Sequence, residues 1–154
     1  STGVISESIL YTEALQVYKL AQQKFKKDSI IIYGKSLGTG IAAQLASIKD
    51  CKRLILETPY YSLPTALETY FGMYPLTAML HFKIPTYQYI KEVVAPITIF
   101  HGTNDGITSY KNSIKLKSLL KSSDELITIE NGSHNNLNDF NLFHQKLDSL
   151  LQLN

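Results

Sequence analysis

The residues best suited to chemistry begin with a serine in a glycine-rich turn. The segment Gly34-Lys35-Ser36-Leu37-Gly38 fits the pattern G-x-S-x-G, between an apolar β-branched run and an alanine-rich stretch. Between a strand and a helix, this pattern forms a nucleophile elbow that holds the serine in strained backbone geometry. Side chains at Gly34 and Gly38 are expected to clash where strand and helix approach each other. The helix N-terminus and the Leu37 N–H are expected to favour an oxyanion.

The same pattern allows a plainer interpretation, a glycine-rich turn in which Ser36 is the N-cap of the following helix. A phosphate-binding loop fits less well, because the spacing G-x-x-x-x-G-K-[ST] is absent from the sequence.

A serine nucleophile needs a general base, and His134 is the best placed of four histidines. It lies in Asn131-Gly132-Ser133-His134-Asn135, directly after the last predicted strand. His81 falls in an irregular segment and His144 on the last predicted helix, so both are interpreted as structural. His101 is also interpreted as structural, because an oxyanion-hole His-Gly pair belongs before the elbow in the chain.

The base in turn needs an orienting carboxylate, and the order serine, acid, histidine favours Asp105. Asp105 follows the third predicted strand in His101-Gly102-Thr103-Asn104-Asp105. Glu57, at the end of the second predicted strand, is the rival acid, although it more plainly braces the elbow or the adjacent loop. Asp139 stands at a helix start and is interpreted as a cap.

The elements that must position these residues alternate along the chain. Apolar runs predict four short strands, and three- and four-residue apolar spacing predicts the helices between them. This order predicts an α/β fold with a parallel sheet of about four strands and flanking helices, with chemistry at the carboxyl ends of the strands. The predicted strands are 30–33, 53–57, 97–101 and 126–130, and the predicted helices are 6–27, 40–48, 64–80, 110–121 and 138–151.

Composition limits the remaining possibilities. The chain has 154 residues, 44% of them hydrophobic and 18% charged, which is typical of one globular domain over 1–154. A net charge of +2 with only local lysine runs argues against nucleic-acid binding. The single cysteine, Cys51, excludes an internal disulfide and fits a reducing, cytoplasmic location. No apolar stretch is long enough for a membrane span, and no motif predicts a metal or another cofactor.

Taken together, three motifs resemble the alpha/beta-hydrolase superfamily of serine hydrolases. They are 33–40, 100–105 and 131–135, and the nearest resemblance is to the serine-aminopeptidase-like, lysophospholipase-like and depalmitoylase-like branch. The resemblance covers essentially the whole chain and implies Ser36 as nucleophile, Asp105 as acid, His134 as base and Leu37 as an oxyanion donor. Segment 60–90 falls where such proteins place a small cap or acyl pocket.

The resemblance is to the C-terminal half of such a hydrolase, because the strands that precede the elbow strand are missing. One side of the elbow strand is therefore expected to be an open apolar edge, covered by a missing N-terminal segment or by a second copy in a homo-oligomer. The loop that supplies the second oxyanion donor is missing as well. We therefore expect the chain to be a fragment of a longer enzyme, weakly active or inactive by itself.

These observations predict a serine acyl hydrolase of the esterase or thioesterase type, acting on a small-molecule acyl substrate through a Ser-His-Asp triad. A serine peptidase of the same fold is one alternative. The other is a non-catalytic binding or assembly module that keeps the hydrolase scaffold, since a fold by itself does not fix a function.

Overall fold

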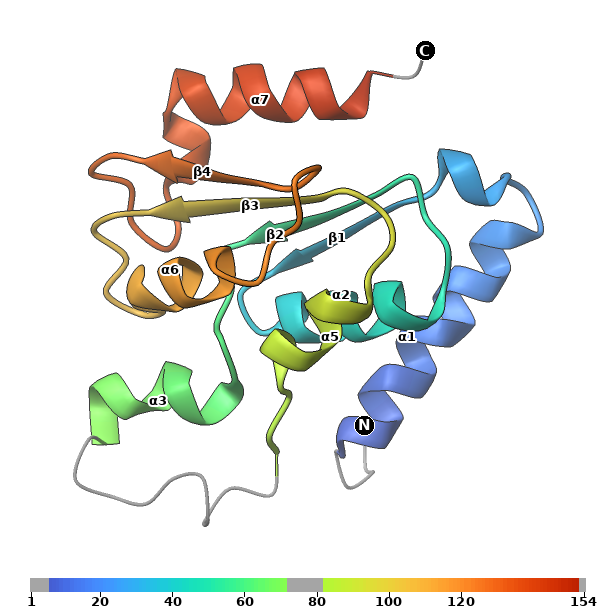
Figure 1. The fold of residues 1–154 in the computed structure, drawn as a ribbon, viewed down its shortest axis with the longest axis horizontal. Helices are drawn as coiled ribbons and strands as arrows, with labels where there is room; N and C mark the ends of the chain where they lie inside the picture. Colours follow the sequence, from blue (N-terminus) through green and yellow to red (C-terminus); the bar gives the residue numbers. More distant parts are fainter. Residues whose placement is uncertain (1–5, 72–81, 153–154) are drawn as a thin grey trace.

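A four-stranded parallel sheet forms the centre of the computed structural model, which describes residues 6–71 and 82–152. The strands are adjacent in chain order, so each helical connection returns the chain to the next position in the sheet (Figure 1). They are β1 (Ile31–Lys35), β2 (Arg53–Glu57), β3 (Ile97–Gly102) and β4 (Glu125–Ile129). The predicted α/β class and the parallel sheet of about four strands are confirmed.

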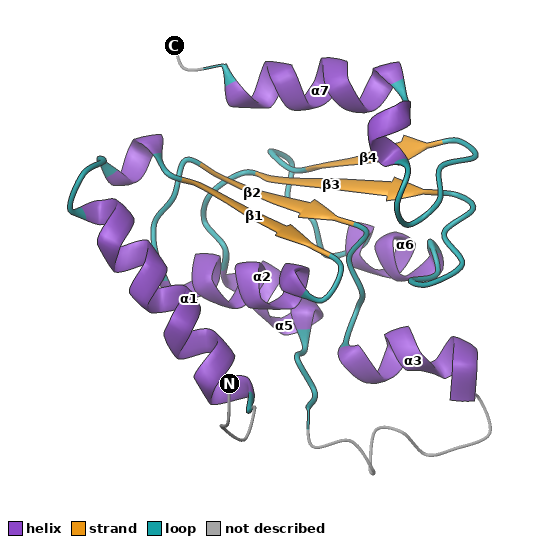
Figure 2. Ribbon diagram, turned by 180° about the vertical axis from the view of Figure 1, so that it is seen from behind, coloured by secondary structure: helices purple, strands orange, loops and turns teal. Residues whose placement is uncertain are grey.

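Helices cover both faces of this sheet. One face carries α7, while α1, α2, α5 and α6 lie on the other, with α3 farther out on that side (Figures 1 and 2). The helices are α1 (Glu7–Gln22), α2 (Gly38–Ile48), α3 (Leu63–Phe71), α5 (Thr86–Glu92), α6 (Lys111–Lys117) and α7 (Asn141–Leu151), with 3-10 turns η1 (Lys27–Ser29) and η2 (Leu137–Asp139).

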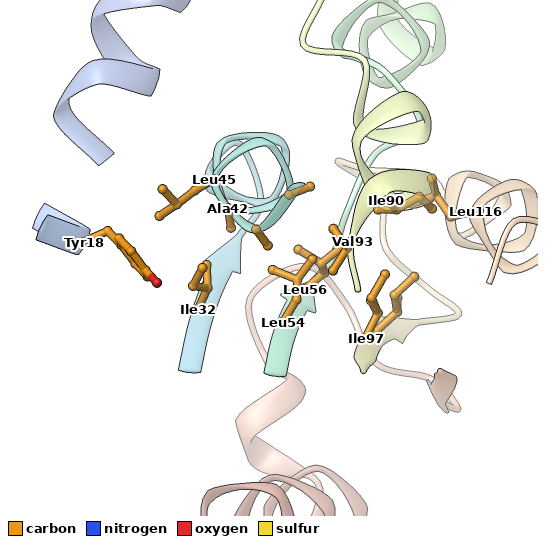
Figure 3. Packing of buried hydrophobic residues seen from close by; sticks show 13 residues of the cluster. Tyr18, Ile32, Ala42, Leu45, Leu54, Leu56, Ile90, Val93, Ile97 and Leu116 are labelled. Carbon is orange, nitrogen blue, oxygen red and sulfur yellow. The ribbon is translucent and has the colours of Figure 1, made fainter. Parts of the chain in front are cut away.

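The core has two layers, because successive strand residues point to opposite faces. Leu54, Leu56 and Ile97 pack with small side chains of α2 such as Ala42 (Figure 3). On the other face, Phe100 meets Phe143 of α7 with ring centroids 4.9 Å apart. Every residue of β3 is buried, which fixes the position from which the loop after β3 leaves the sheet.

Several predicted helix bounds are wrong. The first helix ends at Gln22 rather than Lys27, and a separate 3-10 turn contains Lys27. The last α-helix begins at Asn141, after a 3-10 turn that contains Asp139. Its N-cap position is Phe140, so Asp139 is not the cap that its place in the sequence suggested.

Segment 60–90, expected to form a small cap, is described in part. It contains α3 and most of the unpredicted helix α5, and residues 72–81, including His81, lie outside the described residues. Asn112 of α6 anchors its first part, since Asn112 Oδ1 accepts from Tyr61 N (3.1 Å) and Thr65 Oγ1 (3.0 Å). The ring of Tyr61 stacks on Tyr87 with centroids 4.5 Å apart.

Strand β1 has β2 as its one partner among the described strands. Ser36 N donates to Glu57 O, and Ile30 O accepts from Lys52 N, so the even-numbered residues of this stretch direct their backbone groups towards β2. The odd-numbered residues between them direct their N–H and C=O groups towards the open edge, because backbone groups alternate in direction along a strand. Apolar side chains beside this edge are exposed, including Val17 and Leu20 of α1 and Tyr33 of β1. The apolar residues of α1 are therefore only partly covered: Tyr18 is buried, Ala14 and Leu15 pack half-buried against the core, and Val17 is exposed.

Candidate active site

Ser36 occupies a tight turn between β1 and α2. Its backbone has φ of +49°, a conformation that non-glycine residues rarely adopt. The turn is held on both sides, because Ser36 N donates to Glu57 O (2.9 Å) and Thr39 donates to Ser36 O from N (3.0 Å) and Oγ1 (2.6 Å). The N-cap position of α2 is Leu37, not Ser36, so the plain helix-cap interpretation of this serine is wrong.

The two glycines of the elbow differ in what they do. A Cβ on Gly34 would lie 2.6 Å from Gly38 O and 2.7 Å from Ala42 Cβ, so only glycine lets α2 approach β1 this closely. A Cβ on Gly38 would have no heavy atom within 4 Å among the described residues. The expected clash is therefore correct for Gly34 and wrong for Gly38, which faces open space at the start of the helix.

The loops after β3 and β4 are tied to each other by their backbones. Thr103 N donates to Ile129 O (3.1 Å), and Asn104 N donates to Gly132 O (2.9 Å). Gly102 makes this approach possible, since a Cβ there would lie 2.1 Å from Gly132 O. The two loops therefore hold Asp105 and His134 side by side, although 29 residues separate them in the chain.

Ser36, His134 and Asp105 form one continuous chain of hydrogen bonds. His134 Nδ1 lies 2.8 Å from Asp105 Oδ2, and His134 Nε2 lies 2.8 Å from Ser36 Oγ. An ionised carboxylate only accepts, so Nδ1 carries the proton and Nε2 is free to accept from the serine hydroxyl. Asp105 and His134 are buried and Ser36 is half-buried, which leaves the serine as the accessible end of the chain.

Asp105 is held as an anion by a complete set of donors. Burial by itself would raise its pKa, but hydrogen bonds from His101, His134 and the amides of Thr108 and Ile107 outweigh burial and lower the pKa of Asp105. Oδ1 accepts from Ile107 N (2.8 Å) and Thr108 N (2.7 Å), and Oδ2 accepts from the two imidazoles. At neutral pH the carboxylate is therefore ionised and fixed in orientation.

Glu57, the rival acid, has other partners. Its carboxylate pairs with Lys35 Nζ at 2.6 Å and accepts from the Tyr33 hydroxyl, while its backbone carbonyl holds Ser36 N. Burial and the bond to Glu57 raise the pKa of Tyr33, which keeps that phenol protonated. Glu57 thus braces the elbow, as the sequence suggested.

Two other side chains have clear structural settings. His144 Nε2 lies 2.6 Å from Asn138 O on the exposed surface, in keeping with a structural role. Burial raises the pKa of the Cys51 thiol to about 11, so this cysteine stays protonated and is no competing nucleophile at neutral pH.

His101 makes a contact that the sequence analysis missed. Its Nε2 lies 3.1 Å from Asp105 Oδ2, and its side chain is fully buried. The signal in the sequence is the spacing: a histidine at the end of a strand and an aspartate four residues later, across one turn of loop.

No three His, Cys, Asp or Glu side chains gather as a metal site would require in residues 6–71 and 82–152. In those same ranges, the helices are too short or too polar to cross a bilayer.

A parallel sheet with helices on both faces, and a serine raised on a strand–turn–helix at its carboxyl end, defines an α/β protein with a hydrolase-like arrangement. No protein-family model matches the chain. Over 99% of its length it is 26% identical to the alpha/beta hydrolase domain-containing protein aho-3 of Caenorhabditis elegans and 27% identical to the human alpha/beta hydrolase domain-containing protein 17C, covering 46% and 45% of these proteins.

Among solved structures, acetyl xylan esterase 1 from Thermoanaerobacterium has a similar fold. The TM-score is 0.70 at 13% identity, over 92% of this chain and 51% of that one. Over almost its whole length, the chain is thus similar in sequence to part of the alpha/beta hydrolase domain-containing proteins, and in fold to part of an esterase. It spans about half the length of the curated relatives that it matches, and so carries part of their fold.

Proposed function

We propose that the chain carries the catalytic triad of a serine acyl hydrolase, with Ser36 as nucleophile, His134 as general base and Asp105 as the orienting acid. The observation that carries this proposal is the unbroken hydrogen-bonded chain from Ser36 Oγ through His134 to Asp105 Oδ2. The φ of +49° at Ser36 supports it, because strained backbone geometry is typical of functional positions.

The proposed reaction has two halves. Ser36 Oγ attacks the acyl carbonyl while its proton moves to His134 Nε2, and His134 then returns the proton to the departing alcohol or thiol. Water attacks the resulting acyl-Ser36 ester and gives a proton to Nε2, and release of the carboxylic acid restores the serine hydroxyl. Asp105 stays ionised throughout and stabilises the transient imidazolium.

Leu37 is the proposed donor to the oxyanion that forms in each half. The hydrogen bonds within the described residues do not use its N–H, which lies at the N-terminus of α2, where the helix dipole favours negative charge. One donor of such a site is worth about 10²–10³ in rate. We expect the second oxyanion donor to come from a segment like the one that the relatives have outside the matched half.

An ester or thioester of a small acyl group is the proposed substrate class. A serine activated by a neutral histidine expels an alcohol or a thiol more readily than an amine, so peptide bonds are the less favoured target. Apolar side chains of segment 60–90 support an apolar acyl chain. The solved neighbour described as an acetyl xylan esterase is consistent with ester chemistry.

The test is covalent labelling with a fluorophosphonate, which reports an activated serine without requiring a natural substrate. The wild-type chain, incubated with excess probe, is expected to gain the mass of one adduct, and Ser36→Ala is expected to gain none. Ser118→Ala, which removes an exposed hydroxyl at the C-terminal end of α6, is the matched control and should label fully. A folded wild-type chain that takes up no probe would show that the site is incomplete without the additional chain that the relatives carry, or that it belongs to a non-catalytic scaffold.

If the serine labels, the leaving group can be ranked with three chromogenic substrates of one acyl group. The p-nitrophenyl ester and the acyl thioester are expected to turn over faster than the p-nitroanilide. The reverse order would support the peptidase alternative.

A further inference from the structure

We propose that His101 is a positioning residue for Asp105, a buried neutral imidazole whose Nε2–H shares the carboxylate oxygen that His134 uses. This inference rests on the proposed function, because it assumes that Asp105 is the acid of a triad. Its evidence is the geometry of the loop after β3. His101 ends β3, and Asp105 lies four residues later in that loop.

The hydrogen bonds of His101 fix which of its nitrogens carries the proton. Nε2 lies 2.8 Å from Thr108 O and 3.1 Å from Asp105 Oδ2, two atoms that can only accept. Nε2 therefore carries hydrogen. Nδ1 lies 2.6 Å from Ser113 Oγ, and the serine hydroxyl can donate to it. Both nitrogens are satisfied in the neutral ring, which suits a side chain with no exposed surface.

Few titratable groups face this ring among the described residues. Asp105 is in contact with it, and His134 lies beyond Asp105. The ring of Tyr110, at the start of α6, meets the His101 ring edge-on, with an interplanar angle of 86° and centroids 5.7 Å apart. The hydroxyl of Tyr110 forms a hydrogen bond of 2.6 Å with Thr128 Oγ1 of β4. Asp105 is thus the charged group in direct contact with the His101 ring.

Two imidazoles on one oxygen divide its negative charge. Removing the His101 donor is expected to loosen the carboxylate and to leave more of its charge facing His134 Nδ1. The first effect slows chemistry at Ser36. The second strengthens the hydrogen bond from His134 Nδ1–H to the carboxylate. A side chain that only fills space would produce neither the shift at His134 nor its reversal by a substitute donor.

The experiment compares His101→Leu, which removes the donor, with His101→Gln, whose terminal amide nitrogen stands near the position of Nε2. The fluorophosphonate labelling rate constant is expected to fall on the order of tenfold in His101→Leu, the scale of one lost hydrogen bond to a charged group. In NMR, the proton resonance of His134 Nδ1–H should move downfield, because the hydrogen bond to Asp105 becomes stronger. His101→Gln should restore both values towards wild type, and His144→Leu, the same change at an exposed histidine, should alter neither.

The outcomes separate this inference from the proposed function. A folded His101→Leu variant with the wild-type labelling rate and the wild-type His134 Nδ1–H resonance would overturn it. Should that variant fail to fold, the wild-type spectrum decides, because it must show His101 protonated on Nε2 and bare on Nδ1 at neutral pH. Absence of labelling in every variant would count against the proposed function, while the NMR result would still decide the role of His101.

Discussion

Two halves of the candidate site are built differently. The acid–base half consists of the loops after β3 and β4, where Asp105 and His134 are 8% and 7% exposed and Asp105 accepts from four donors. The nucleophile half consists of β1, the turn at Ser36 and the start of α2, where Tyr33 and Leu37 are 42% and 49% exposed. The acid–base half is closed by the chain's own residues, whereas the nucleophile half presents apolar surface along the open edge of β1.

This difference teaches that alignment of the three side chains and enclosure of a substrate are separate properties. Alignment depends on short-range backbone ties between neighbouring loops, all of them within this chain. Enclosure depends on what lies beside β1, and the curated relatives carry about as much chain again beyond the matched half.

The largest expected effect is the loss of the acid. Asp105→Asn is expected to lower the labelling rate constant by about 10⁴, because an amide cannot hold His134 in the required tautomer. Glu57→Gln is the matched control in the nucleophile half and should stay within about tenfold of wild type, since its amide oxygen can still accept from Tyr33 and the Lys35 ammonium that loses its partner is half-exposed. Equal losses in the two variants would show that the acid has been assigned to the wrong half.

The next effect concerns the contact between the two loops of the acid–base half. Gly102→Ala places a Cβ against the backbone of Gly132, which has no flexible end to move aside. We expect the loops to separate, with a loss of about 1–3 kcal/mol in the free energy of unfolding and a much slower labelling rate. Urea unfolding and labelling measure the two quantities. A variant that keeps both wild-type values would show that the loops can part without disturbing His134.

A loss of stability of similar size is expected at the elbow, where two glycines can be compared directly. Gly34→Ala should lower the free energy of unfolding by about 1–3 kcal/mol, because the new methyl group meets Gly38 O and Ala42. Gly38→Ala should change it by less than about 1 kcal/mol, since the position is open and alanine favours a helix. Similar losses at both sites would mean that α2 does not pack on β1 as closely as described.

Much of this arrangement could be predicted from the sequence because its signals are local. The β-branched run before Gly34 and the alanines after Gly40 determine a strand and a closely packed helix, and the loop motifs give Asp105 and His134 their places after strands. Less could be predicted where tertiary contacts decide. The bond from His101 to Asp105 depends on how the loop curls back, and the exposure of Val17 and Leu20 depends on what stands beside β1.

The end of the first helix shows the same limit. Apolar spacing continues from Ala21 to Phe25, yet the helix ends at Gln22 and the side chain of Phe25 is exposed. Periodicity reports which residues share a face, and only packing shows whether that face is covered.

The smallest expected effect is on the acid stability of the closed half. Since the pKa of Asp105 is lowered in the folded chain, its ionised form stabilises the fold above the unfolded-state pKa of about 3.9. That contribution is lost as the pH falls through the lower, folded-state pKa. Asp105→Asn has no such proton to bind, so its free energy of unfolding should depend less on pH below about pH 4. The difference in free energy of unfolding between the variant and the wild type should therefore narrow as the solution becomes more acidic.

Urea unfolding over a pH series measures this difference. Asp139→Asn is the control, because it removes an exposed carboxylate and should follow the wild-type curve. A gap that stays constant down to pH 2 would show that the four donors do not favour the ionised form of Asp105.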